Sequence, residues 1–225
     1  MSPVTRRVLQ IVVAMCVQIV LLLGAAGSVA WTAAWVYVGL DLAMVLVGWL
    51  VLAPGHRDVI EERSRGTAGT PSWDVPLTRA LRVEGFGVLV VAGLDERWGW
   101  SAPLPVALRA GGAVLLVLGY VVAVAAMWVN PFFSQAVRIQ GERGHTVVTT
   151  GPYAYVRHPG YVGMMLSMLG APLLLDSLWA LVPWAAYAAT LVVRTAGEDR
   201  MLTEELAGYA EYRMRTRWRL VPGVW

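Results

Sequence analysis

The chain has 225 residues, of which 57% are hydrophobic and 15% charged, against roughly 45–50% and about 25% in soluble globular proteins. Its net charge of +3 is too small to indicate a nucleic-acid partner, the single Cys16 excludes an internal disulfide, and no Cys/His spacing predicts a metal site. All eighteen basic residues are arginine, which excludes a P-loop lysine. With eleven tryptophans, a residue enriched at membrane–water boundaries, this composition predicts an integral membrane protein.

The apolar stretches predict about six transmembrane helices, since each helix needs about 20 mostly apolar residues. Single spans are expected at residues 8–29, 31–52, 83–100 and 104–128. The longer stretch 161–193 is interrupted at Pro172 and Asp176, which predicts a helical hairpin of two short spans. The fold class is therefore all-α and polytopic.

The arginines predict which side of the membrane each end occupies. With six spans and an inner N-terminus, every arginine except Arg97 and Arg109 lies in an inner segment, as the positive-inside rule requires. We therefore expect both termini in the cytoplasm, and the arginine-rich, lysine-free composition indicates a bacterial cell membrane. Alternatively, the first apolar run and the small residues 28–30 mimic a cleaved signal peptide.

Two polar segments flank these spans. Residues 54–82 are rich in Gly, Arg, Thr and Pro and predict a cytoplasmic loop. Residues 198–217 predict an amphipathic helix lying on the membrane, with its apolar side chains on one face. We therefore divide the chain into an N-terminal hairpin with its loop (1–91) and a core (92–225).

The polar stretch 130–161 concentrates the groups that could carry chemistry. Its β-branched run 147–150 ends in a Gly-Pro turn, and Arg157-His158-Pro159 precedes the next span. Proline suits the first turn of a helix, whose free N–H groups can hold an anionic or hydrogen-bonding ligand. The structural alternative is a helix cap beside an arginine that reaches toward the membrane surface.

Arg194 and Glu198 lie four residues apart, on one face of any helix that continues from the last span. The arginine could hold a carboxylate through two parallel hydrogen bonds, and the glutamate could accept one from a ribose hydroxyl. The alternative is an ordinary ion pair between the two. Asp41, inside a span, is expected to hydrogen-bond to a neighbouring helix.

The chain resembles the isoprenylcysteine carboxyl methyltransferase family, integral membrane enzymes that use S-adenosyl-L-methionine. The resemblance covers residues 92–225 and rests on GPYAYVRHPGYVG (151–163), the hairpin, Arg194, Glu198, YAEY (209–212) and RLVPGVW (219–225). The wider group of small membrane methyltransferases, phospholipid N-methyltransferases included, shares much of this pattern.

The resemblance implies a cofactor site for S-adenosylmethionine and a contact to the acceptor. The implied cofactor residues are Gln140, His145, Thr146, Val147, Val148, Tyr153, His158, Pro159, Gly160, Tyr161 and Glu198. Arg194 is implied to face the carboxylate of the acceptor, and Arg194 and Glu198 are the residues expected to serve catalysis.

We therefore expect a methyltransferase that acts on the carboxylate of a prenylcysteine-like, isoprenoid or other lipid acid. Its partners are then membrane lipid and a lipophilic or prenylated substrate, with neither nucleic acid nor metal. Three alternatives remain open: an N-methyltransferase for amino lipids, an NADPH-dependent membrane reductase, and a membrane protein without enzymatic activity.

Overall fold

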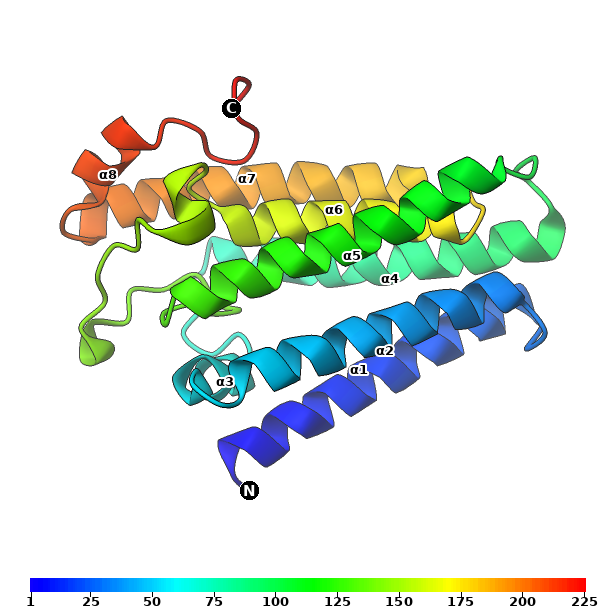
Figure 1. The fold of residues 1–225 in the computed structure, drawn as a ribbon, viewed down its shortest axis with the longest axis horizontal. Helices are drawn as coiled ribbons and strands as arrows, with labels where there is room; N and C mark the ends of the chain where they lie inside the picture. Colours follow the sequence, from blue (N-terminus) through cyan, green and yellow to red (C-terminus); the bar gives the residue numbers. More distant parts are fainter.

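The computed structural model describes residues 1–225 and consists of helices without strands, which confirms the all-α prediction. Its long helices are α1 (Pro3–Ala26), α2 (Thr32–Leu52), α4 (Asp74–Trp98), α5 (Val106–Val129), α6 (Pro159–Leu174) and α7 (Leu181–Glu205). The short ones are α3 (Arg57–Ser64), the 3-10 turns η1 (Gly141–Arg143) and η2 (Gly151–Ala154), and α8 (Tyr209–Arg215). The long helices run along one axis, and both termini lie at the end that carries α3 and α8 (Figure 1).

Three helices, not six, are long and apolar enough to cross a membrane: α1, α2 and α5. Helix α6 has 16 residues and extends only about 24 Å at 1.5 Å per residue, short of a hydrocarbon core of about 30 Å. Helices α4 and α7 are long, but charged residues occupy both ends of α4 and the second half of α7. The expected six spans are therefore corrected to three candidate spans, with three further helices packed beside them.

The predicted hairpin is confirmed by α6 and α7, and the turn between them is built from buried polar groups. Pro172 stays inside α6, and the chain turns at Asp176, whose φ is +63°. The Asp176 carboxylate accepts a hydrogen bond from the Leu104 amide at 2.6 Å. Nearby, the Asp95 carboxylate at the end of α4 accepts one from the Ser177 hydroxyl at 2.5 Å. These hydrogen bonds connect the end of α4, the segment before α5 and the turn between α6 and α7, at the end of the bundle opposite the termini.

The C-terminal segment does not form the single helix expected over residues 198–217. Helix α7 ends at Glu205, Leu206 is extended, and α8 begins after Gly208, whose φ is +82°. Residues with a side chain rarely adopt that conformation, so glycine permits the bend. The bend turns Leu206 and Tyr209 inward, where both are buried beside Tyr153.

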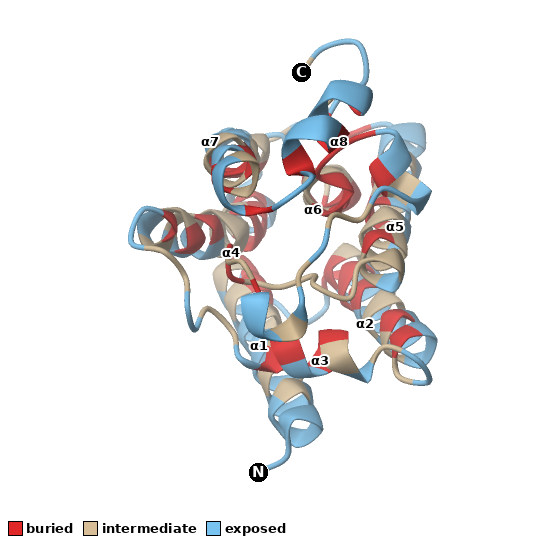
Figure 2. Cartoon of the chain, turned by 90° about the vertical axis from the view of Figure 1, so that its left-hand side faces the viewer, coloured by how far each residue is buried: buried red, intermediate tan, exposed pale blue.

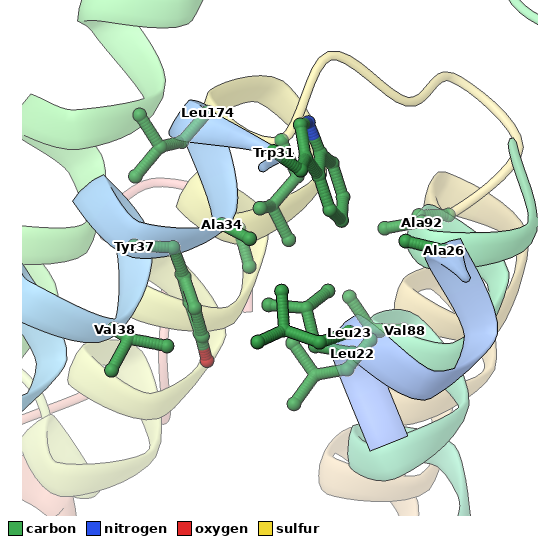
Figure 3. Close-up of a cluster of buried hydrophobic side chains, with 14 of the residues drawn as sticks. Leu22, Leu23, Ala26, Trp31, Ala34, Tyr37, Val38, Val88, Ala92 and Leu174 are labelled. Atoms are coloured by element: carbon green, nitrogen blue, oxygen red, sulfur yellow. The ribbon is translucent and has the colours of Figure 1, made fainter. Parts of the chain in front are cut away.

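The main hydrophobic cluster joins the N-terminal helices to the rest of the bundle. Its members from α1 and the start of α2 pack against α4, α5 and α6. Figure 3 shows Leu22 and Leu23 of α1 between Tyr37 of α2 and Val88 of α4. Viewed from the end that carries the termini, the buried residues turn toward the middle of the bundle (Figure 2). Asp41 of α2 accepts a hydrogen bond from the Tyr120 hydroxyl of α5, as expected for a carboxylate inside a span.

Helices α5 and α6 touch backbone to backbone along a row of glycines. Gly112 and Gly119 of α5 face Gly170 and Gly163 of α6 respectively, and the two glycines of each helix are seven positions apart. A Cβ atom on Gly119 would stand 2.2 Å from the Ser167 amide nitrogen, far inside van der Waals contact. Small residues allow such close helix packing in membranes. The row sets how the C-terminal end of α5 meets the N-terminal end of α6.

Gly112→Ala should therefore destabilise the bundle, whereas Gly111→Ala should not. A Cβ on Gly112 would lie 2.5 Å from the Leu174 amide nitrogen, but one on Gly111 meets nothing within 4 Å. We expect the first variant to lose about 3 kcal/mol through overpacking and the second to match or slightly exceed the wild type. Thermal unfolding of both detergent-purified variants measures this. Equal unfolding temperatures would show that the helices separate without cost.

Candidate active site

An open pocket lies at the end of the bundle that carries the termini. The end of α5, the loop 130–148, η2, the start of α6, the end of α7 and α8 surround it. It encloses about 800 Å³ of empty space, counted out to the solvent at its mouth. Much of this space lies at the open mouth of the pocket, so the residues that line it, rather than its volume, indicate which ligand it takes.

The structure brings most of the predicted cofactor residues into this pocket. Those that line it are His145, Thr146, Val147, Val148, Tyr153, His158, Gly160, Tyr161 and Glu198. Gln140, Pro159 and Arg194 do not line it. Of the three tyrosines in the segment 151–163, Tyr153 and Tyr161 line the pocket, whereas Tyr155 is exposed outside it.

Gln140 is buried and shapes the loop beside the pocket. Its side-chain amide donates to the Phe132 carbonyl at 2.6 Å and accepts from the Arg143 guanidinium. Its backbone N–H donates to Nδ1 of His145, whose ring stacks on Phe132 with centroids 4.4 Å apart. Burial, and then the cations of Arg143 and Arg138, lower the pKa of His145. His145 therefore presents a neutral imidazole to the pocket near pH 7.

His158 closes the start of α6 and lies between two acidic side chains. Its Nε2 is 3.5 Å from Asp199 and its Nδ1 is 3.8 Å from Glu198. The ring stacks on Tyr161, with centroids 5.7 Å apart and planes 4° apart. Pro159 occupies the first turn of α6 and is buried, as its role in starting the helix predicts. The adjacent carboxylates hold His158 in one orientation at the pocket wall.

Glu198 carries the acidic charge that faces the pocket. Its Oε2 accepts a hydrogen bond from the Tyr161 hydroxyl at 2.5 Å, and its side chain remains 22% exposed. No protein group donates to Oε1, so that oxygen is available to a ligand. A carboxylate fixed on one oxygen and free on the other suits a ligand that donates a hydroxyl or carries positive charge.

Arg194 does not form the ion pair with Glu198 that the sequence analysis gave as the alternative. Its Nε and Nη2 bind the two oxygens of Asp74 at 2.8 and 2.9 Å, and Nη2 also donates to the Gln135 carbonyl at 2.8 Å. The guanidinium carbon lies 5.5 Å from the centre of the Tyr161 ring, which lines the pocket. Arg194 is thus buried next to the pocket, with two nitrogens already bound.

The pocket depends on a second buried carboxylate, Asp199, that the sequence did not single out. Two nitrogens of Arg157 reach it at 2.7 and 3.0 Å, Nε of Arg219 at 3.0 Å and the Tyr209 hydroxyl at 2.9 Å. Burial alone would raise the pKa of Asp199, but hydrogen bonds from His158 and from these arginines hold it well below its usual range. Asp199 therefore connects the segment before α6, helix α8 and the C-terminal segment to α7.

The segment expected to be a polar loop over 54–82 instead contains α3 and the start of α4, and it braces the pocket loop. The Glu62 carboxylate of α3, 3% exposed, holds Arg138 through two hydrogen bonds of 2.9 Å each. Asp58 binds Arg143 at 2.9 Å. Since Arg138 lines the pocket, the N-terminal part of the chain positions a wall of the site.

Comparison with known proteins shows what the pocket-bearing helices are similar to. Residues 112–204 match the isoprenylcysteine carboxyl methyltransferase (ICMT) family. The chain is 33% identical over 149 residues to the cobalt-zinc-cadmium resistance protein CzcN of Cupriavidus metallidurans, a match that covers 64% of this chain and 59% of that protein. It is 36% identical over 87 residues to the protein-S-isoprenylcysteine O-methyltransferase of Schizosaccharomyces pombe, covering 36% of this chain and 37% of that protein.

The mouse protein-S-isoprenylcysteine O-methyltransferase is 34% identical over 101 residues, which cover 44% of this chain and 34% of the mouse protein. The chain thus spans about 59% of the bacterial relative and less of the two eukaryotic ones. The family match over residues 112–204 confirms the resemblance found in the sequence. These residues include α6 and most of α5 and α7, the helices whose ends form the pocket.

Asp199→Asn should destabilise the pocket end of the bundle by about 3–5 kcal/mol at pH 7, because it leaves buried arginines without their counter-ion. The depressed pKa makes this contribution present above about pH 4, the value of an unfolded aspartate, and lost as pH falls below it. The difference in Tm between wild type and variant should therefore shrink from pH 7 to pH 3. Glu211→Gln, an exposed change on α8, is the control. A constant difference would contradict the assignment.

Proposed function

We propose that this chain is an integral membrane methyltransferase that transfers a methyl group from S-adenosylmethionine to the carboxylate of a lipophilic acceptor. The observation that carries the proposal is the convergence of nine residues that match the family pattern on one pocket, beside Arg194. The named isoprenylcysteine methyltransferases among its relatives support the same activity.

The residues that line the pocket suit S-adenosylmethionine. Apolar and aromatic side chains, among them Phe132, Leu206 and Tyr209, supply an apolar surface for a nucleoside. Oε1 of Glu198 is available to accept from ribose hydroxyls. The Tyr153 ring and the Glu198 charge favour a cation such as a sulfonium. Once bound, this cofactor supplies an electrophilic methyl group.

Arg194 is the residue we propose for the acceptor carboxylate, through one nitrogen. Asp74 already takes Nε and Nη2, while Nη1 makes no hydrogen bond within the protein. A single charge-assisted hydrogen bond from Nη1 therefore replaces the two parallel bonds expected from the sequence. A carboxylate is already ionised near neutral pH, so this chain needs no general base. Its contribution to rate is to hold and orient the two reactants.

The geometry is consistent with a donor that enters from water and an acceptor that enters from the membrane. The pocket opens at the end of the bundle where both termini lie (Figure 1). The distribution of arginines favours a cytoplasmic location for this end. We propose an isoprenoid or lipid acid of a bacterial membrane as the natural acceptor.

N-methylation of an amino lipid is a second candidate, and one observation favours it. Because Asp74 neutralises Arg194, the site carries less net positive charge for a carboxylate than an unpaired arginine would give. Such an enzyme would use the same donor pocket and would not require Nη1 of Arg194.

Saturable binding of S-adenosylmethionine to the detergent-purified protein is the expected result of calorimetry. Glu198→Gln should weaken binding at least tenfold, because a charge-assisted hydrogen bond contributes about 1.5–3 kcal/mol and tenfold corresponds to about 1.4 kcal/mol. His158→Ala should also weaken it. Glu205→Gln, an exposed change at the end of α7, should bind like the wild type. A folded wild-type protein that binds NADPH instead would contradict the proposal.

Methyl transfer to N-acetyl-S-farnesylcysteine should give a base-labile product. An ester releases methanol in alkali, whereas an N-methyl product does not. We therefore expect radioactivity from methyl-labelled S-adenosylmethionine to become volatile after base treatment of the lipid extract. Stable label on an added amino lipid, with none on the acid, would favour the N-methyltransferase.

A further inference from the structure

The Asp74–Arg194 pair joins two parts of the chain that the family match separates. Asp74 is the first residue of α4 and lies outside the matched residues 112–204, while Arg194 is in α7 within them. The Asp74 carboxylate is fully buried and Arg194 is 5% exposed. The two oxygens of the carboxylate face the two nitrogens Nε and Nη2 in parallel.

A second contact fixes the start of α4 against the same part of α7. A Cβ atom on Gly197 would lie 2.5 Å from the ring of Trp73, so the indole packs directly on the backbone of α7. Gly197 is three residues beyond Arg194 and adjacent to Glu198. Trp73 and Asp74 therefore dock as neighbours on one turn of α7, and the glycine makes room for them.

These contacts leave the guanidinium of Arg194 one orientation. Asp74 binds the Nε edge, the Gln135 carbonyl takes a further hydrogen of Nη2, and the Tyr161 ring covers a face. Nη1 is the nitrogen that makes no hydrogen bond, and unlike Nε of Arg109 it is not fully buried. The side chain is thus held rigidly, with a single donor left for a ligand.

We propose that Asp74 is a positioning residue that aims Nη1 of Arg194 at the carboxylate of the methyl acceptor. This inference rests on the proposed function. It assigns a role in acceptor recognition to the N-terminal part of the chain, which contributes Asp74 and Trp73. The donor pocket has its own carboxylate in Glu198, so Asp74 acts on the acceptor and not on S-adenosylmethionine.

The Asp74–Arg194 ion pair is better explained by the positioning of Arg194 than by stabilisation of the fold. A buried ion pair is weak grounds for inferring stability, since its desolvation cost offsets much of the attraction between the charges. A fixed side chain loses little further freedom when a ligand binds, which favours the bound complex. The value of Asp74 therefore lies in the pre-set geometry of Arg194.

A double-mutant cycle with a conservative variant tests this. The variants are Asp74→Asn, Asp74→Glu, Arg194→Gln and the double variant Asp74→Asn/Arg194→Gln. The double variant removes both charges of the pair, so it can be measured even where Asp74→Asn alone leaves Arg194 unpaired and prevents folding. Asp95→Asn is the matched control, a buried aspartate at the other end of α4 that accepts hydrogen bonds from Ser101 and Ser177. Each detergent-purified protein is measured for its Kd for S-adenosylmethionine and for kcat and KM with N-acetyl-S-farnesylcysteine.

We expect Asp74→Asn to lower kcat/KM for the acceptor at least tenfold while the Kd for the donor changes less than twofold. Asp74→Glu keeps the charge and should recover at least threefold of that loss. In the Arg194→Gln background, Asp74→Asn should have no further effect, because it acts only through the arginine. Asp95→Asn should lower Tm but leave kcat/KM unchanged.

Folded Asp74→Asn protein with wild-type kcat/KM would overturn the inference, as would losses that add in the double variant. Either result leaves the proposed function intact, since the wild type remains active in the same assay. A folded wild type that binds the donor but methylates no carboxylate would overturn the acceptor assignment and the inference with it. These outcomes therefore distinguish a failure of the inference about Asp74 from a failure of the proposed function.

Discussion

The backbone contact between α5 and α6 is the constraint on which the site depends. Where Gly119 faces Gly163 there is no room for a side chain, so the two helices have a fixed separation and register. Asn130 follows the end of α5, and its side-chain amide binds the hydroxyl of Tyr153 at 2.9 Å. The same contact fixes the start of α6, where His158 lies. The shape of the pocket therefore depends on the packing of α5 against α6.

Buried carboxylates hold the pocket loop in place where helix packing does not reach it. The 130–158 connection has little regular structure, and it is held by Asp199 on one side and Glu62 on the other, both 3% exposed or less. Each of these carboxylates binds arginine, whose planar fork matches the two oxygens. An all-arginine set of basic residues suits this construction, because lysine would offer a single point charge in place of two directed bonds.

The sequence was sufficient for the features that depend on local composition. Hydrophobic runs predicted α1, α2 and α5, and the interruption at Asp176 predicted the hairpin of α6 and α7. It was insufficient where tertiary contacts decide. The end of α7 was predicted to continue through residue 217 because its pattern is helical, yet the burial of Leu206 and Tyr209 favours a bend at Gly208. The span count failed because charged helices such as α4 bury their polar ends against neighbours.

The same distinction applies to the site. His158 and Glu198 were predictable because motif and spacing mark them, whereas Asp74 was not, since 120 residues separate it from its partner Arg194. A lone aspartate at a helix start resembles an ordinary favourable residue of the first turn. Only the fold brings Asp74 against Arg194 and Asp199 against Arg157. An arginine that a family pattern assigns to a substrate therefore also needs its internal partner identified, because that partner decides which of its nitrogens remains available.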